Sequence, residues 1–145
     1  MNQADPKRVA RVIASGCVAL RVRRLGRVVT RIYDSALAPH GINISQLNLL
    51  AAISIAEGAR QVDLGRILDV EKSTLSRDLK RMEELGWIES RPLASGRGRA
   101  VALTPAGARL LEQAQPAWEK AQKAARSRLG RSAFAQLRGL LGPPI

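Results

Sequence analysis

Hydroxyl and cationic side chains alternate over residues 72–80 of this 145-residue chain. Serine and threonine hydroxyls can hydrogen-bond to DNA bases or phosphates, and arginine can hold guanine through two hydrogen bonds. Leu75, Leu79 and Met82 recur at helical spacing and fall on the opposite face. The stretch is therefore predicted to be a helix whose polar face suits a DNA groove, with candidate contacts from Lys72, Ser73, Thr74, Ser76, Arg77 and Lys80.

A charged helix face is most often only solvated, so the neighbouring sequence has to decide between the two interpretations. Leu64, Ile67 and Leu68 predict a second short helix just before the first. Between the two helices, Val70 lies in a short polar turn, which is typical of a helix-turn-helix. Gly86 follows the last periodic residue, where a glycine usually ends a helix in the left-handed conformation.

A β-hairpin is predicted directly after these helices. Residues 87–91 alternate like a strand, residues 94–98 form a glycine-rich turn, and residues 100–103 are apolar enough to return as the second strand. A hairpin in this place makes a winged helix. Narrow A·T minor grooves attract arginine, and the predicted hairpin adds the candidate DNA-binding residues Arg91, Arg97 and Arg99, with Arg97 at the tip.

Three stretches carry a resemblance to a known family: STLSRDLKRMEELGWIESRP, then GRGRAVALTPAG, and upstream YDSALAPHGINISQLNLLAAI. From about residue 9 to about residue 141 the chain resembles the MarR family of bacterial transcription regulators. The resemblance implies a triangular homodimer with two DNA-reading lobes. Family members often carry an aspartate two residues before the tip arginine, whereas this chain has Ser95 before Arg97, which leaves the usual internal pairing in doubt.

Composition agrees with a polyanionic partner. The net charge of +12 and the pI near 11.5 favour nucleic acid, with an anionic membrane surface as the rival. Residues 1–40 carry eight Lys or Arg against two acids, residues 41–104 nine against eight, and residues 105–145 seven against two. No run approaches the roughly 20 apolar residues of a membrane span, and residues 1–12 lack the apolar core of a secretory signal. We expect one cytoplasmic domain.

The first long segment, residues 6–37, is predicted to be one helix that begins at Asp5-Pro6. Its apolar residues step by alternating four and three, which indicates packing against another helix over many turns. So large an apolar face in a small domain favours a second subunit as the partner. The seam consists of Val18, Val22, Leu25, Val29, Ile32 and Ala36, and Arg23, Arg27 and Arg31 form a separate stripe.

The remaining helices complete a mainly α fold with a small β-hairpin wing. Ser45 is predicted to cap one helix, Thr104-Pro105 to open another, and Pro116 to bend or restart it. Residues 129–131 break that helix, and Ser132 starts the last one. The predicted organisation is a single domain over residues 1–145, with a winged helix-turn-helix over 45–104 flanked by dimerisation helices over 6–40 and 105–145.

Enzyme chemistry has little support in the sequence. His40 is the only histidine and Cys17 the only cysteine, so neither a metal site of the common kind nor an internal disulfide is expected. Gly96 and Gly98 lie between predicted strands, where they shape a hairpin and do not cradle a phosphate. We expect no catalytic residues, no metal and no cofactor.

Cys17 has two competing interpretations. Ile13, Cys17 and Leu20 form an apolar stripe, which favours simple packing. The resemblance offers a redox sensor instead, since peroxide-sensing relatives carry a reactive cysteine near the start of this helix, and Arg21 is close enough to stabilise a thiolate. It also implies a ligand site between the dimerisation helices and the winged helix, suited to an aromatic carboxylate or phenol and made of Cys17, Arg21, Arg24, Tyr33, Leu47 and Trp118.

The sequence therefore predicts a sequence-specific, ligand-responsive repressor that binds a pseudo-palindromic operator on double-stranded DNA as a homodimer. A redox-sensing repressor that uses Cys17 is the first alternative. The second is an architectural protein that binds DNA without sequence specificity.

Overall fold

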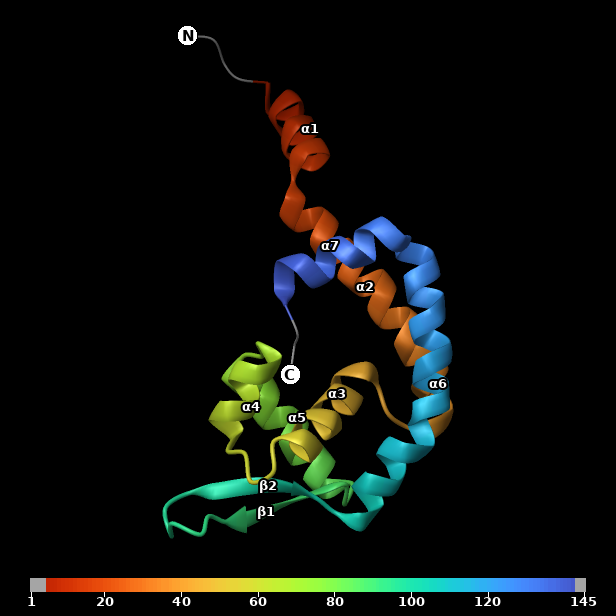
Figure 1. The fold of residues 1–145 in the computed structure, drawn as a ribbon. Coiled ribbons are helices and arrows are strands. Elements are labelled where there is room, and N and C mark those ends of the chain that lie inside the picture. Colours follow the sequence, from red (N-terminus) through yellow and green to blue (C-terminus); the bar gives the residue numbers. More distant parts are fainter. Residues whose placement is uncertain (1–4, 143–145) are drawn as a thin grey trace.

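Helices make up most of the chain in a computed structural model that describes residues 5–142. A two-stranded antiparallel hairpin lies between the fifth and sixth α-helices (Figure 1). In chain order the elements are α1 (Pro6–Gly16), α2 (Val18–Leu37), the 3-10 helix η1 (Ala38–His40), α3 (Ile44–Ile55), α4 (Gln61–Leu68), α5 (Lys72–Glu84), β1 (Ile88–Pro92), β2 (Arg99–Leu103), α6 (Pro105–Leu129) and α7 (Arg131–Leu141). The predicted mainly α fold with a β wing is confirmed.

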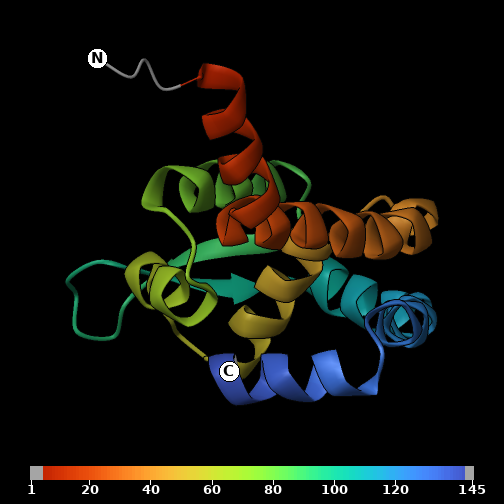
Figure 2. The ribbon, with the colours of Figure 1, turned by 90° about the horizontal axis from the view of Figure 1, so that it is seen from above.

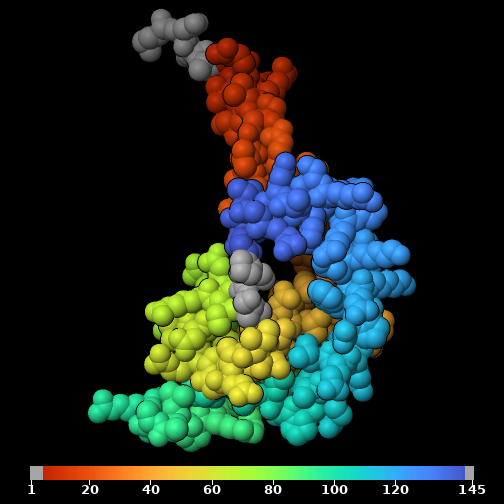
Figure 3. Space-filling view, in the orientation of Figure 1, coloured from red at the N-terminus to blue at the C-terminus, as the bar shows by residue number. Residues whose placement is uncertain are grey.

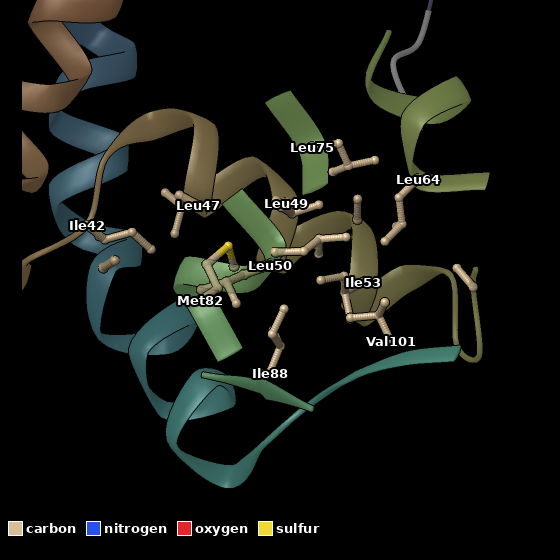
Figure 4. Close-up of a cluster of buried hydrophobic side chains, with 14 of the residues drawn as sticks. Ile42, Leu47, Leu49, Leu50, Ile53, Leu64, Leu75, Met82, Ile88 and Val101 are labelled. Atoms are coloured by element: carbon tan, nitrogen blue, oxygen red, sulfur yellow. The ribbon is translucent and has the colours of Figure 1, made fainter. Parts of the chain in front are cut away.

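The buried core lies between α3, α4, α5 and the hairpin. Leu50, Leu64 and Met82 are fully buried there and point toward one another from three different helices (Figure 4). Ile88 and Val101 close the cluster from the two strands. The core is built almost entirely from aliphatic side chains, so it fixes the relative positions of α5 and the hairpin by packing alone.

The turn between α4 and α5 has the predicted form. Asp69 adopts the left-handed conformation with φ of 50° and ends α4. Val70 follows as a half-buried residue packed on the core. At the other end of α5, Gly86 has φ of 74°, its N–H donates to Glu83, and the N–H of Trp87 donates to Met82 at 3.0 Å. This pair of hydrogen bonds is the Schellman arrangement, which requires the left-handed glycine.

The base of the hairpin is held to the start of α6. Ile88 pairs with Leu103 in the strand register. The hydroxyl of Thr104 donates to the carbonyl oxygen of Gly86 at 2.6 Å and accepts from the N–H of Gly107 at 3.1 Å, so Thr104 caps α6 as predicted. Gly107 is buried against the backbone of Trp87, which leaves no room for a side chain. This junction sets where the hairpin begins.

The prediction of one helix over residues 6–37 is wrong. Cys17 takes an extended conformation with φ of −68° and ψ of 108° and separates α1 from α2. The break is stabilised locally, because the Cys17 sulfur accepts from the N–H of Leu20 and the Arg21 guanidinium donates to the carbonyl oxygens of Ser15 and Cys17. Gly16 favours a break at this point, since glycine is a poor helix former.

Smaller boundary predictions also need correction. Asn43 and not Ser45 caps α3, through a reciprocal capping box with Gln46. The last helix begins at Arg131, one residue before Ser132. Helix α6 does not restart at Pro116, which lies inside one continuous helix of 25 residues.

Among the terminal helices, α2 and α6 reach the core cluster through Leu37 and Ala114. Helix α2 runs along α6. Seen from above, α6 is viewed nearly end-on, and α2 and α7 extend from it toward the same side (Figure 2). Helix α1 and the hairpin lie at opposite ends of the molecule (Figure 3). Burial of the predicted seam residues changes along α2: Val18 and Val22 are 71% and 62% exposed, whereas Val29 and Ile32 are half-buried.

Candidate nucleic-acid interface

Helix α5 separates an apolar face from a polar one, as the sequence predicts. Leu75, Leu79 and Met82 are buried in the core. The polar side chains predicted to bind DNA are all exposed: Lys72, Ser73, Thr74, Ser76, Arg77 and Lys80. On a helix, residues 73, 77 and 80 lie nearly opposite the buried stripe, so Ser73, Arg77 and Lys80 form the centre of the free face. Thr74 lies to one side, in a small groove shared with Asp78 and α3.

We call the hairpin of residues 88–103 the wing. A groove lies between α5 and the wing. Its volume is about 290 Å³ and it brings Ser76 and Lys80 of α5 together with Arg99 of the wing. Glu83 and Glu89 lie in the same groove. Two cations and a hydroxyl from separate elements therefore share one surface, although two carboxylates partly offset their charge.

The three predicted wing arginines have different surroundings. The Arg91 guanidinium forms an ion pair with Glu89, with Nε 2.7 Å from the carboxylate oxygen. Arg99 donates to the carbonyl oxygen of Ser90 at 2.7 Å. Arg97 is exposed at the tip and has no ion-pair partner among residues 5–142. Arg97 is therefore the wing arginine whose whole guanidinium can meet a ligand.

The tip conformation depends on its glycines. Gly96 and Gly98 have φ of 73° and 93°, which other residues rarely adopt. The N–H of Leu93 donates to the carbonyl oxygen of Gly98 at 3.1 Å and closes the turn. The two glycines thus hold Arg97 on a tight loop that projects beyond the rest of the protein (Figure 1).

A second groove, which sequence reasoning missed, lies between α4 and the start of α5. It has a volume of about 540 Å³, and Arg66 and Lys72 line it together with Asp69. In helix-turn-helix proteins the first helix crosses the DNA backbone, so Arg66 is a candidate phosphate contact. The available signal was its place on the polar face of the predicted first helix.

The predicted ligand residues fall into separate groups. Leu47 and Trp118 line one cavity between α3 and α6. The hydroxyl of Tyr33 donates to the side-chain oxygen of Gln122, and burial raises the pKa of Tyr33, although the charge of Arg126 opposes the shift. Cys17 and Arg21 lie together at the junction of α1 and α2, while Arg24 is exposed on α2.

His40 lies in the 3-10 turn. Within the part of the chain that the structure describes, no group of His, Cys, Asp and Glu is arranged to hold a metal ion. In the same part, no helix is long and apolar enough to cross a membrane.

An exposed polar helix in a helix-turn-helix, followed by a cationic hairpin, defines a winged-helix protein. The sequence profile of the MarR family matches residues 40–99. The multiple antibiotic resistance protein MarR of Salmonella typhimurium is 37% identical over 84 residues, which are 57% of this chain and 58% of that protein. The chain thus spans little more than half of this relative.

Solved structures extend the similarity beyond the winged helix. A cysteine-to-serine variant of E. coli MarR complexed with operator DNA has a TM-score of 0.79 and 26% identity, covering 95% of this chain and 96% of that one. The M. tuberculosis transcriptional regulator MosR in complex with DNA has a TM-score of 0.72 and 30% identity, covering 83% and 92%. The chain belongs to the MarR family.

Proposed function

We propose that the protein is a transcriptional regulator that binds operator DNA as a homodimer. The observation that carries the proposal is the exposed face of α5, with Ser73, Arg77 and Lys80 at its centre, beside a wing that projects Arg97. Two structures similar over most of the chain, those of E. coli MarR and M. tuberculosis MosR, contain DNA. The net charge of +12 supports a polyanionic partner.

Arg77 and Arg97 have different proposed roles. Arg77 lies in the first half of α5, where side chains of a helix in the major groove reach base edges. Arg97 enters the minor groove, where only A·T and G·C pairs can be told apart. Base reading therefore rests mainly on α5, and the wing contributes attraction that depends on groove width.

The experiment compares Arg77→Ala and Arg97→Ala on operator and random duplexes across a salt series. Arg77→Ala should lose about 1–3 kcal/mol on the operator and little on random DNA, because a base contact carries specificity. Arg97→Ala should weaken binding to both duplexes and reduce the salt slope by about one unit. Arg138→Ala, which removes the same charge from α7, is the matched control. Equal losses for Arg77→Ala on both duplexes would assign Arg77 to phosphate and refute its role in specificity.

Exposed apolar side chains on the terminal helices support the homodimer. Val12 and Ile13 of α1 are 66% and 61% exposed, Val22 of α2 is 62% exposed, and Leu140 of α7 is 81% exposed. Large apolar surface on several neighbouring elements is typical of an interface. Burial of these side chains against a second subunit is the arrangement we propose.

Association is tested by Val22→Glu, which places a carboxylate in the proposed interface. The variant should dissociate in analytical ultracentrifugation and lose affinity for a pseudo-palindromic operator, since one half-site then binds alone. Ile55→Glu is the matched control, because Ile55 is 66% exposed and lies at the end of α3. A Val22→Glu protein that sediments as a dimer would remove α2 from the interface.

An architectural DNA-binding protein is the alternative of a different class. Such a protein would lose operator and random binding together as salt rises, whereas a regulator keeps its preference for the operator. The same titrations therefore separate the two functions without further variants.

Within the regulator class, one observation favours a redox response as a second candidate. The Cys17 sulfur accepts the N–H of Leu20 at 3.4 Å and caps α2, while Arg21 lies against the same turn. Oxidation of this sulfur would change the cap and the angle between α1 and α2. An organic hydroperoxide should then weaken operator binding of the wild type and not of Cys17→Ser. Identical responses of the two proteins would leave a bound ligand as the proposed switch that relieves repression.

A further inference from the structure

A cavity of about 470 Å³ lies between α3 and α6. Its size is within the range of pockets that hold small ligands. The two helices contact each other, and the α3 and α6 colours meet in the space-filling view (Figure 3). The lining residues are Leu47, Asn48, Ala51, Leu111, Glu112, Gln115 and Trp118.

The charge of this cavity is opposite to that of the protein. Glu112 is the one charged side chain among the described lining residues, in a chain with net charge +12. The Gln115 amide donates to the carboxylate of Glu119 at 3.0 Å, so the carbonyl oxygen of Gln115 stays available as an acceptor. A second carboxylate, that of Glu119, therefore follows the lining residue Trp118 in the sequence. The polar part of the described wall thus consists of one carboxylate and two amides, Asn48 and Gln115, so its formal charge is negative.

Pro116 adds another acceptor at the same level of α6. Proline has no N–H, so the carbonyl oxygen of Glu112, four residues earlier, cannot receive its usual helical hydrogen bond. This unpaired carbonyl oxygen adds partial negative charge beside the Glu112 carboxylate, which attracts a cation whether or not the cation donates a hydrogen bond. A carboxylate ligand would face Glu112 with like charge.

The apolar part of the wall also favours a cation with an apolar body. Leu47, Ala51 and Leu111 supply aliphatic surface, and Trp118 supplies an indole, the aromatic side chain that attracts cations most strongly. Trp118 is half-buried and packs on the core, so its ring is held in place. An indole face and a carboxylate around an apolar floor form a site for a cation with an apolar body.

We propose that this cavity binds a monovalent organic cation, a protonated arylalkylamine or an aryl-bearing quaternary ammonium compound, as the effector of the regulator. Only the role of the cation as an effector rests on the proposed function; binding of the cation in the cavity does not. The ligand class replaces the aromatic carboxylate or phenol that the sequence resemblance implied. Helix α3 packs against both α4 and α6, so a ligand between α3 and α6 acts on the position of the DNA-binding helices relative to α2 and α6.

The test measures ligand binding by calorimetry without DNA, so it does not depend on operator recognition. Three probes share a phenyl ring: benzyltrimethylammonium, its neutral isostere neopentylbenzene, and benzoate. The cation should bind about tenfold more tightly than the neutral isostere, and benzoate should not compete with it. Equal affinity for the cation and its neutral isostere, or tighter binding of benzoate at this cavity, would overturn the proposal.

Variants then locate the site. Glu112→Gln should weaken binding of the cation about three- to tenfold and leave the affinity for neopentylbenzene unchanged. Glu57→Gln, which removes the same charge just after α3, should change neither affinity. Trp118→Phe should weaken binding of the cation less than Trp118→Leu does, because phenylalanine keeps an aromatic face. An unchanged cation affinity in Glu112→Gln and Trp118→Leu places the ligand elsewhere and refutes the assignment.

A separate operator titration in benzyltrimethylammonium tests the effector role. Weaker operator binding by the wild type and not by Glu112→Gln supports it, and no effect on DNA in a protein that binds the cation refutes it. A protein that binds the cation and no DNA at all would refute the proposed regulator and leave the cation site standing.

Discussion

Gly107 is the residue where a single added methyl group should separate the wing from α6. A Cβ at this position would lie 2.0 Å from the carbonyl oxygen of Trp87 and 2.9 Å from its carbonyl carbon. Atoms in favourable contact keep about 3.5 Å or more, so one backbone must move away from the other by more than about 1 Å. Neither side can give way cheaply, because Gly107 lies inside α6 and the Trp87 backbone is held by hydrogen bonds to Met82 and Thr104.

The movement has a cost that can be worked out from the contacts at the junction. Overpacking of a rigid site typically costs about 1–3 kcal/mol. The hydrogen bonds from the Thr104 N–H to Trp87 and from the Thr104 hydroxyl to Gly86 are strained with it, at about 0.5–1.5 kcal/mol each. Alanine regains up to about 1 kcal/mol as a better helix former. We expect Gly107→Ala to lower the free energy of unfolding by roughly 2–4 kcal/mol.

Urea denaturation followed by circular dichroism measures this change, with Gly26→Ala as the matched control. Gly26 lies inside α2, and a Cβ there meets nothing within 4 Å among the described residues, so alanine should stabilise the protein by about 0.5–1 kcal/mol. Because the junction also positions Arg97, Gly107→Ala should weaken DNA binding at temperatures where it is folded. A Gly107→Ala protein as stable as Gly26→Ala would refute the close contact.

Three further predictions concern stability and its dependence on pH. Leu64→Ala should cost about 2–5 kcal/mol in urea denaturation, because Leu64 is fully buried, while exposed Val62→Ala should change little; similar small effects would contradict the core assignment. Hydrogen bonds from the backbone and side chain of Arg60 hold the pKa of Asp63 below its ordinary value. The stability contributed by Asp63 is therefore full above the unfolded pKa and is lost as pH falls through the folded pKa. The gap in urea midpoint between the wild type and Asp63→Asn should shrink from pH 7 to the acid range, and a constant gap would argue against the cap. Burial raises the pKa of Tyr33, so its folded form resists ionisation and stability falls as pH rises above about 10. Tyr33→Phe should remove that alkaline loss, and an identical alkaline profile for both proteins would rule out Tyr33 as its source.

Much of the winged helix could be read from local sequence. The apolar spacing of Leu75, Leu79 and Met82 gives a helix with one buried face, and Gly86 gives its end, because both depend on backbone geometry within a few residues. The same is true of the glycine-flanked tip that carries Arg97 and of the Thr104 cap. These predictions succeeded because each signal lies within one turn of the feature that it specifies.

The break at Cys17 shows where local pattern failed. Helical periodicity continues across Gly16 and Cys17, so the sequence predicted one helix. The extended backbone at Cys17 is stabilised by the Arg21 guanidinium, which reaches back to the carbonyl oxygens of Ser15 and Cys17. A side chain that supplies hydrogen bonds to backbone on the other side of a break leaves no trace in apolar periodicity.

The sequence by itself determined the order of the elements from α3 onward, the polar face of α5 and the arginine at the wing tip, since these follow from spacing and glycine positions along the chain. Only the packed hairpin decided that Arg99 donates to the carbonyl oxygen of Ser90 on the neighbouring strand, because the two residues are nine apart in the chain. The tertiary structure also decided the cavity in which Leu47 meets Trp118 and Glu112. Residues so far apart in the chain meet only after α3 and α6 pack, and that contact depends on the whole core.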